Sequence, residues 1–339
     1  QILESAEAIE KRKDVKLNVF AIANSKSILL NKNGVSTDWK NEIQTNGVSY
    51  TIDDVIAYAN EHHLENLIAV DNTASATFVE NYISLAENSF DLISSNKVAN
   101  TLSYGFYKDL RTVLAENQKN YLYETNVGAG LPLIDTIKLL HLSGENITKI
   151  KGVFSGTLSY LFNHFSAKDV PFSEILKEAI DSGFTEPDPR EDLCGNDVGR
   201  KLLILARELD LQNEFEEVAI QNLIPEHLRE GSAADFLTKL KEFDPIYDKI
   251  KSDQKPNHVL RYIGELSGDL QHDKGILEVK LVSVPSDTAL GGLKGSDSFF
   301  EIYTESYGDR PIVIQGAGAG SAVTARGVFG DILRLSDKG

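Results

Sequence analysis

The first 130 residues alternate short apolar runs with amphipathic stretches, and this alternation constrains the fold more than any other feature of the sequence. Strand-like apolar runs occupy Val15–Ala23, Asn66–Ser75, Phe90–Lys97 and Asn120–Gly128. The stretches between them carry apolar residues at helical spacing, as in IDDVIAYANEHH (Ile52–His63). Strands and helices that alternate at this spacing are typical of a parallel, doubly wound α/β sheet. We therefore predict a domain of this class over residues 1–129.

Polar residues follow three of the predicted strands, at 24–26, 71–75 and 94–97. In a doubly wound sheet, ligands bind beyond the carboxyl ends of the strands. Small polar side chains at these ends can approach a nucleotide closely, although ordinary turn chemistry also explains any single cluster. Three clusters at corresponding strand ends favour a crevice for a dinucleotide.

A glycine-rich phosphate loop normally precedes the first helix of such a sheet, and this chain opens inside that helix. Gln1–Lys13 has the amphipathic pattern of the later part of a helix and begins without a cap. We therefore expect the first strand and the glycine-rich loop to lie before Gln1. The string QGAGAG (Gln315–Gly320) also stands between a predicted strand and a helix, but no strand follows to complete a βαβ unit. Alone it is a weak signal for a dinucleotide.

The pattern changes after Gly130. Three helical patterns run through Leu176, Leu205 and Leu237, and several strand patterns and a last helix follow them. This order predicts an α+β domain over residues 130–310. Residues 311–339 are predicted to return to the first domain.

The charge balance and the single cysteine exclude several classes of partner and site. Lys plus Arg number 34 and Asp plus Glu number 51, which gives a formal net charge of −17. So acidic a chain does not favour a nucleic-acid backbone or an anionic membrane as its main partner. Cys194 alone cannot form an internal disulfide framework or a multi-cysteine zinc site, and a reducing cytoplasm is the simplest location. No apolar run approaches the roughly 20 residues that span a bilayer.

The string GFTEPDPREDLCGNDVGRK (Gly183–Lys201) crowds acidic residues into one short span that ends in Arg200 and Lys201. Clustered carboxylates repel one another, so such a cluster usually contains a cation, here the Lys201 ammonium or a substrate ammonium. The following DVGRKLLILAREL has a helical pattern that Asn196 or Asp197 can cap. On that helix Asp197 and Lys201 stand four residues apart on one face. An ordinary surface ion pair is the alternative interpretation.

Two glycine-containing strings, TNVGAGLP (Thr125–Pro132) and FSGTLSY (Phe154–Tyr160), lie where the first predicted domain meets the second. Glycines there allow the backbone to approach a ligand or an ion, and a plain interdomain turn is the equal alternative. The histidines show no metal-ligand spacing, so we interpret them as structural or exposed.

Together these strings resemble the homoserine dehydrogenase family. The similar strings are Asn96-Lys97, TNVGAGLP, FSGTLSY, GFTEPDPREDL, DVGRKLLIL, LKGSD (Leu293–Asp297) and QGAGAGSAVTARGV, which cover the chain from about Ala21 to its end. ANSKS (Ala23–Ser27) and the long GFTEPDPR run resemble the dehydrogenase half of bifunctional aspartokinase/homoserine dehydrogenases. Whether an aspartokinase precedes Gln1 is a question for the sequence upstream.

The resemblance implies a Rossmann-type nucleotide-binding domain and an α+β domain that binds substrate and forms a homodimer or a higher homo-oligomer. It implies the reversible reduction of L-aspartate 4-semialdehyde to L-homoserine by NAD(P)H, in threonine and methionine biosynthesis. It also implies site residues. Lys201 and Lys97 match the catalytic lysines, and the substrate residues are Glu186, Asp192, Asp197, Gly156, Thr157 and Phe184. Thr73 and Ser75 match cofactor contacts, and Glu124 with the backbone of Val127, Ala129 and Leu131 matches a site for a monovalent cation, Na⁺ or K⁺. With the strand-end turns and the glycine-rich loop described above, the predicted cofactor residues are Asn24, Ser25, Lys26, Thr73, Ser75, Asn96, Lys97 and Gly318. Position 184 is Phe here and often Tyr in the family.

The expected chemistry also fits the residue types. Hydride addition to an aldehyde creates an alkoxide, which a nearby ammonium can stabilise and protonate. We therefore expect Lys201 to donate the proton and Lys97 to orient and polarise the aldehyde. The Asn24-Ser25-Lys26 turn offers amide, hydroxyl and cation instead of the acid that binds an NAD ribose, which favours NADP over NAD.

Two other functions stay open at this point. One is a dehydrogenase of the same architecture that acts on another amino-acid semialdehyde or 2-amino acid. The other is a catalytically silent regulatory or scaffolding domain, although the presence of both lysines and all three acids argues against it.

Overall fold

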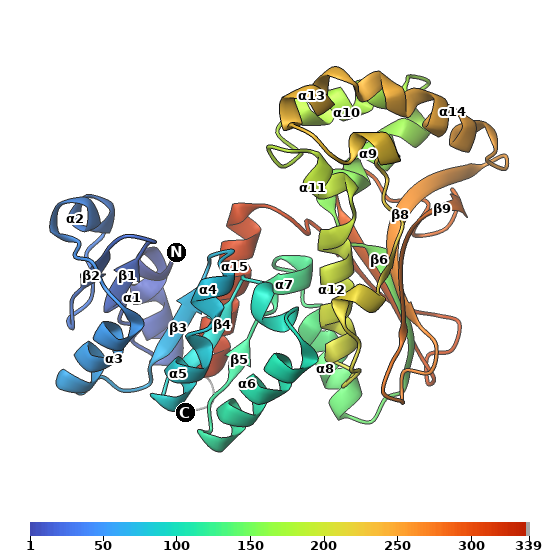
Figure 1. The fold of residues 1–339 in the computed structure, drawn as a ribbon. Helices are drawn as coiled ribbons and strands as arrows, with labels where there is room; N and C mark the ends of the chain where they lie inside the picture. The colour runs from blue at the N-terminus through green and yellow to red at the C-terminus, as the bar shows by residue number, and fades with distance from the viewer. Residues whose placement is uncertain (337–339) are drawn as a thin grey trace. The chain divides into compact units, whose positions relative to one another are not determined.

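The structure, a computed structural model, describes residues 1–336, and its chain divides into two units. The first unit contains Gln1–Val98, Lys108–Tyr123 and the chain from Ala325 onward. The second unit contains Ala99–Tyr107 and Glu124–Thr324. Neither unit is a continuous segment, because the chain passes between them several times (Figure 1).

A three-stranded parallel sheet lies at the centre of the first unit. Its strands are β3 (Ile68–Asp71), β4 (Asp91–Ser94) and β5 (Tyr121–Leu122), in the order β3-β4-β5. Ile68 pairs with Asp91, and Leu92 pairs with Tyr121. The parallel pairing confirms the predicted α/β class, and it places the polar segments 71–75 and 94–97 at the same edge of the sheet.

The helices of the first unit follow the predicted alternation. They are α1 (Ile2–Lys13), α2 (Trp39–Asn46), α3 (Ile52–Glu61), α4 (Ala76–Val79) and α5 (Tyr82–Glu87), with η1 (Val98–Asn100), α6 (Tyr104–Glu116) and α15 (Ser321–Ser336) lying partly in each unit. Local sequence sets their starts: the Thr51 hydroxyl accepts the Asp54 N–H (3.2 Å), and the Asp54 carboxylate accepts the Thr51 N–H (2.8 Å), which forms a capping box for α3.

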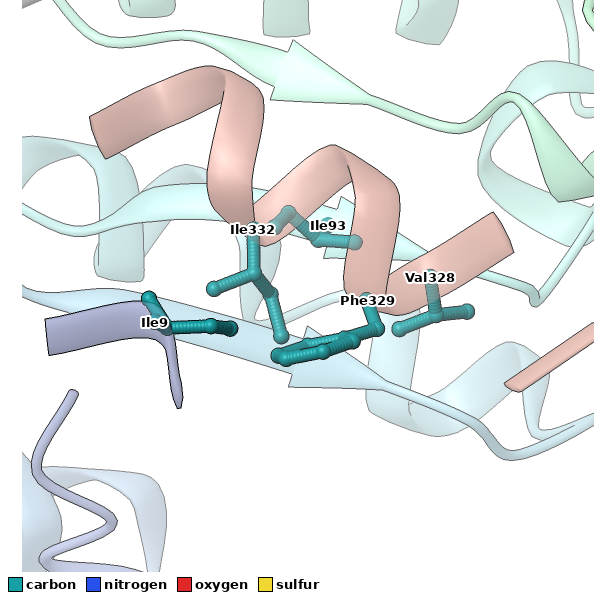
Figure 2. Close-up of a cluster of buried hydrophobic side chains, with 5 residues drawn as sticks. All are labelled: Ile9, Ile93, Val328, Phe329 and Ile332. Carbon is teal, nitrogen blue, oxygen red and sulfur yellow. The ribbon is translucent and has the colours of Figure 1, made fainter. Parts of the chain in front are cut away.

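The core of the first unit joins the two ends of the chain. Figure 2 shows Ile9 of α1, Ile93 of β4, and Phe329 and Ile332 of α15 packed together, with Val328 beside them. Ile93 and Leu92 point to opposite faces of the sheet because side chains alternate along a strand. Helix α5 also packs against β4, so helices cover the sheet as the doubly wound pattern requires.

One predicted strand is wrong. The sequence predicts a strand of the parallel sheet over Val15–Ala23, but the strand β1 contains only Ala21–Ala23. It pairs antiparallel with β2 (Ile28–Leu30) in a separate two-stranded sheet. The Asn24 side chain closes this hairpin by accepting the N–H groups of the two residues that follow Ser25. Such local side-chain bonding reverses the chain earlier than apolar periodicity indicates.

A six-stranded sheet forms the framework of the second unit. Its strands are β6 (Ile147–Val153), β7 (Ala219–Ile220), β8 (His258–Ser267), β9 (Ile276–Pro285), β10 (Ser298–Thr304) and β11 (Ile312–Gly316), in the order β11-β10-β6-β8-β9-β7. The pairs are antiparallel except for β7 with β9. This separate sheet, with its helices, confirms the predicted α+β part of the fold.

The second unit has helices that pack on β8 and helices that pack on other helices. They are α7 (Thr125–Gly128), α8 (Ile134–Leu142), α9 (Gly156–Ala167), α10 (Phe172–Asp181), α11 (Arg190–Leu193), α12 (Asn196–Arg207), α13 (Ala233–Thr238) and α14 (Asp244–Ser252), with 3₁₀ turns η2 (Phe215–Glu217), η3 (Glu226–Leu228) and η4 (Leu240–Phe243). Helices α9 and α12 lie on the same side of β8 (Figure 1). Gly264 permits this approach, because a Cβ there would stand 2.9 Å from the Phe154 ring and 3.3 Å from Val198.

Among residues 1–336, no helix combines the length and the apolar character needed to cross a bilayer.

Candidate active site

Asp71, the last residue of β3, centres a hydrogen-bond network at the carboxyl ends of β3 and β4. The residue is 3% exposed. Its carboxylate accepts hydrogen bonds from the Thr73 N–H (2.7 Å), the Tyr82 hydroxyl (2.7 Å) and Asn96 Nδ2 (2.9 Å). Asn96 Nδ2 also donates to the Ser75 carbonyl (3.1 Å). The network therefore brings together three of the predicted cofactor residues, with a fourth next in the chain: Thr73, Ser75, Asn96 and Lys97.

Sequence patterns select Asp71 and Ser94 only as parts of polar turns, and they do not select Tyr82. The Tyr82 hydroxyl, whose proton is donated to Asp71, also lies 3.0 Å from Ser94 Oγ. The available signal was the acid that ends the apolar run IAVD, since a carboxylate at a buried strand end requires donors around it.

The other predicted cofactor turn lies elsewhere in the first unit. Asn24 Oδ1 accepts the N–H groups of Lys26 (2.8 Å) and Ser27 (2.9 Å), and the Asn24 carbonyl accepts the Tyr50 hydroxyl (3.0 Å). These bonds place Asn24, Ser25 and Lys26 in the exposed turn of the β1–β2 hairpin rather than at the end of a parallel strand.

In the second unit, Lys201 is buried beside an acid. The residue is 8% exposed, and its Nζ lies 2.7 Å from Asp197 Oδ2, one helical turn earlier on α12. Nζ also donates to the Phe154 carbonyl (2.8 Å), which follows β6. The predicted ion pair therefore exists, and its ammonium lies between α12 and the sheet instead of extending into solvent.

Asp192 lies beside other residues predicted to bind substrate. Its Oδ2 accepts the Glu186 N–H (2.8 Å), and Thr157 Oγ1 donates to the Phe184 carbonyl (2.6 Å). Burial raises the pKa of Asp192; the hydrogen bonds from the Glu186 N–H and Thr157 oppose this rise, and the negative charges of Glu186 and Asp197 add to it. A carboxylate in these surroundings is suited to a cationic ligand, because a positive charge relieves both the burial and the repulsion.

The Phe184 side chain is 39% exposed, and its ring stacks on Tyr160 with the centroids 4.2 Å apart. The Tyr160 hydroxyl donates to Glu178 (2.9 Å). Position 184 therefore presents an aromatic face that is held from behind by Tyr160.

Gly195, not Asn196 or Asp197, precedes the first turn of α12, so the predicted cap is wrong. Helix α12 begins at Asn196 with Gly195 as its N-cap, and no side chain caps it. Gly195 has φ 79°, and a Cβ there would stand 2.1 Å from the Tyr262 hydroxyl. The sharp entry between α11 and α12 therefore requires glycine, and it leaves the Asp197 carboxylate available to Lys201.

The glycine-rich loop 315–320 lies beside the start of α9. A Cβ on Gly156 would stand 3.5 Å from Cβ of Ala319 and 3.3 Å from the Ser296 carbonyl. A Cβ on Gly318 would stand 1.9 Å from Ser298 Oγ. The structure thus places the predicted cofactor residue Gly318 near the predicted substrate residues Gly156 and Thr157, all within the second unit.

Glu124 is a buried acid at the start of the longer segment of the second unit. Its carboxylate oxygens accept the N–H groups of Ile134 (2.8 Å) and Asp135 (2.9 Å), the first turn of α8. Burial, with the nearby Asp135, raises the pKa of Glu124 to about 8. The predicted cation ligands Val127, Ala129 and Leu131 follow within seven residues. In the described part of the chain, no group of three or more His, Cys, Asp or Glu side chains forms a metal site, so a cation here would need backbone carbonyls in addition to the Glu124 carboxylate.

Two family models match the chain. The model described as "Homoserine dehydrogenase" matches residues 132–333, and the model described as "Homoserine dehydrogenase, NAD binding domain" matches residues 3–124. Among curated proteins, a chloroplastic bifunctional aspartokinase/homoserine dehydrogenase of Zea mays is 38% identical over 99% of this chain, which spans 36% of that protein. A homoserine dehydrogenase of Paracoccidioides brasiliensis is 36% identical over 89% of this chain and 84% of its own length. The chain thus spans little more than a third of the bifunctional relatives it matches.

Solved structures share the fold. A Candida auris protein of unknown function superposes with a TM-score of 0.86 at 33% identity and covers 99% of this chain and 96% of its own. A hyperthermophilic archaeal homoserine dehydrogenase in complex with NADPH gives a TM-score of 0.70 at 22% identity and covers 98% of this chain and 93% of its own.

We expect Gly195→Ala to destabilise the second unit by about 2 to 5 kcal/mol, because it combines left-handed strain with a clash against the Tyr262 hydroxyl. Gly183→Ala is the matched control, since Gly183 has φ 71° but a Cβ there would meet nothing within 4 Å. That control should cost about 1 kcal/mol, from strain alone. Urea unfolding followed by circular dichroism measures both. Equal losses in the two variants would contradict the close approach at Gly195.

Proposed function

The chain belongs to the homoserine dehydrogenase family, and we propose that it catalyses the reversible, nicotinamide-dependent reduction of L-aspartate 4-semialdehyde to L-homoserine. The reaction is a step in the biosynthesis of threonine and methionine from aspartate. The observation that carries the proposal is the buried Lys201 ammonium, held by Asp197 and the Phe154 carbonyl in the unit that also contains Asp192 and Thr157.

The acids of the second unit would hold the substrate. Both substrate and product carry an α-ammonium, and Glu186 and Asp192 offer two carboxylates for it. The burial of Asp192 and the negative charge of Glu186 beside it favour a bound cation. The exposed Phe184 ring would pack against the short carbon chain. The N–H groups in the first turn of α9, at Gly156 and Thr157, suit the α-carboxylate, because a helix N-terminus favours negative charge.

Lys201 would carry the proton. A bound nicotinamide supplies the hydride in reduction and accepts it in oxidation. As the aldehyde carbon gains hydride, its oxygen becomes an alkoxide, and the Lys201 ammonium transfers a proton to that oxygen; in oxidation the neutral amine removes the hydroxyl proton. Asp197 stabilises the ammonium form and fixes its direction. Lys97, which follows the strand-end network of β4, would orient and polarise the aldehyde.

The proposed cofactor is NADP. Thr73 and Ser75, tied to the strand ends, and Gly318, in the loop before α15, are the proposed contacts to it. The hairpin turn Asn24-Ser25-Lys26 presents an amide, a hydroxyl and a cation, which suit a 2′-phosphate better than a 2′-hydroxyl. The archaeal homoserine dehydrogenase that shares this fold is described in complex with NADPH. A reducing cytoplasm would suit a chain with a single cysteine.

Lys201→Ala should lower kcat for homoserine oxidation by about 10²- to 10⁴-fold, because it removes the proposed general acid and base. The assay follows the absorbance of reduced nicotinamide with L-homoserine and NADP or NAD, and circular dichroism checks the fold. Lys177→Ala is the matched control: Lys177 also pairs with an acid four residues away, Asp181 at 2.7 Å, but its side chain is 67% exposed.

Near-normal turnover in Lys201→Ala would refute the assignment of Lys201. A wild-type protein that oxidises an analogue of homoserine and not homoserine itself would instead identify another amino-acid dehydrogenase. A wild-type protein that binds the nicotinamide and turns over none of these substrates would identify a silent domain.

A monovalent cation, Na⁺ or K⁺, is proposed beside Glu124. The raised pKa of this buried carboxyl means that its ionised form lacks sufficient compensation within the protein. Backbone carbonyls of Val127, Ala129 and Leu131, with the carboxylate, are oxygen ligands of the kind that hard cations prefer. Such an ion would fix the segment between β5 and α8.

The cation should stabilise the protein more at pH 9 than at pH 6. Glu124 has a pKa of about 8 when folded and an ordinary value of 4.5, so without a cation its contribution to stability falls as pH rises from about 4.5 through 8. A bound cation offsets this loss where the carboxylate is ionised. The measurement is Tm in NaCl or KCl against choline chloride at equal concentration. Glu124→Gln should remove the pH-dependent difference, and a difference that persists in this variant would contradict the site.

A homodimer through the second unit is also proposed. Lys151 and Glu301 pair at 3.0 Å, and Lys280 lies 3.4 Å from Glu265, on the face of the sheet opposite the helices that pack on β8. Val313 pairs with Glu301, so it shares this face, and it is 46% exposed. Alternating cations and anions around an apolar side chain suit a two-fold interface, in which a patch must complement itself.

Val313→Arg should shift the equilibrium from dimer toward monomer, as measured by sedimentation equilibrium. In a two-fold dimer the two added arginines would face each other and the Lys151 side chains of both protomers, and these positive charges would repel. Leu139→Arg is the matched control, since Leu139 is an apolar residue that is 71% exposed on α8 of the same unit. A monomeric wild type, or a dimer that Val313→Arg leaves unchanged, would contradict the proposed face.

A further inference from the structure

The Asp71 carboxylate fixes donors from two other segments of the first unit. Tyr82 begins α5 and Asn96 follows β4, and both donate to the same oxygen, Oδ2. A buried carboxylate is costly unless donors surround it, so the bonds constrain both partners and not Asp71 alone. Burial, more than the neighbouring Tyr121 and Asp71, raises the pKa of Tyr82, so its phenol keeps the proton that it donates.

Asn96 uses all of its polar groups inside this network. Its backbone N–H donates to Ser94 Oγ (2.8 Å), and its carbonyl accepts from the same hydroxyl (2.9 Å). Its Nδ2 donates to Asp71 Oδ2 and to the Ser75 carbonyl, and its Oδ1 accepts the Val98 N–H (3.0 Å). The residue is 2% exposed.

These bonds enclose Lys97. Asn96 immediately precedes Lys97, and its side-chain oxygen Oδ1 accepts the N–H of Val98, which immediately follows Lys97. The amide can do this in one orientation only, with nitrogen toward Asp71 and oxygen toward Val98. A flipped amide would place its oxygen against the Asp71 carboxylate. Both groups are acceptors, so they would repel each other and form no hydrogen bond. Asp71, together with the Ser75 carbonyl, therefore fixes the amide orientation that holds the backbone at Lys97.

We propose that Asp71 is a positioning residue for Lys97, acting through the orientation of the Asn96 amide. The inference rests on the proposed function, in which Lys97 orients and polarises the aldehyde. Asp71 touches neither substrate nor cofactor in this role. Its effect on turnover passes through the lysine, because a polarising ammonium is useful only where the carbonyl oxygen lies.

A double-mutant cycle tests whether Asp71 acts through Lys97. Asp71→Asn keeps the shape of the side chain but replaces one acceptor by a donor, and it should lower kcat by about 10- to 100-fold. In a Lys97→Ala background the same substitution should cause no further loss, because effects that pass through one group are not additive. If Asp71→Asn folds poorly, Asn96→Ala replaces it in the cycle. This variant removes the other partner of the Asp71–Asn96 hydrogen bond and should show the same non-additive loss.

Asp91→Asn is the matched control. Asp91 stands at the amino end of β4, and its Oδ1 accepts the backbone N–H (2.7 Å) and the side-chain amide (2.8 Å) of Asn120. Asp91→Asn should lower stability and leave kcat unchanged, because the bonds of Asp91 hold the amino end of β4, whereas Lys97 follows its carboxyl end.

A second readout is independent of turnover. The rate at which acetic anhydride modifies Lys97, mapped by mass spectrometry against the exposed Lys177, should rise several-fold in Asp71→Asn and stay unchanged in Asp91→Asn. If wild type fails to oxidise homoserine while Lys97 labelling changes as expected, the positioning role stands and the proposed function fails.

Three results would overturn the positioning role. The first is unchanged kcat and unchanged labelling in Asp71→Asn. The second is a loss that adds fully to that of Lys97→Ala. The third is a rise in KM for the cofactor alone, which would show that Asp71 acts through its bond to Thr73 and the following turn.

Discussion

The burial of the Lys201 ammonium is the interaction on which the second unit depends. Removing an ammonium from water costs several kcal/mol unless charge and hydrogen bonds replace the lost hydration. Asp197 supplies the charge and the Phe154 carbonyl supplies an acceptor, so helix α12 and the end of β6 are fixed to each other at this point. The rotation of α12 is thereby set, and with it the position of the acids that precede the helix.

Much of this arrangement could be predicted from the sequence, because it follows from local spacing. The i, i+4 pairing of Asp197 with Lys201 comes from the helical period of 3.6, and the parallel order of β3 and β4 comes from the alternation of strands with helices. The hairpin at Asn24 and the entry at Gly195 do not follow from either pattern. In the first, side-chain acceptors compete with the strand; in the second, a distant residue, Tyr262, leaves room only for glycine.

The Asp71 network shows the same limit in the functional region. Its members lie 11 residues apart, as Asp71 and Tyr82, and 25 apart, as Asp71 and Asn96, and no repeat connects those positions. Only the folded sheet brings them to one edge, because parallel strands end on the same side. The sequence shows that polar residues follow the strands, whereas the structure shows which of them bond to one another.

The two lysines are held in different ways, and their proposed tasks explain the difference. A group that gives up and regains a proton must be stabilised in its charged form by a partner that stays in place, and Lys201 has that partner one turn away on the same rigid helix. A group that polarises a carbonyl keeps its charge throughout, so its position matters more than its basicity. The hydrogen bonds around Lys97 meet that need. The buried side-chain amide of Asn96 makes these bonds, and it fixes the backbone on both sides of Lys97.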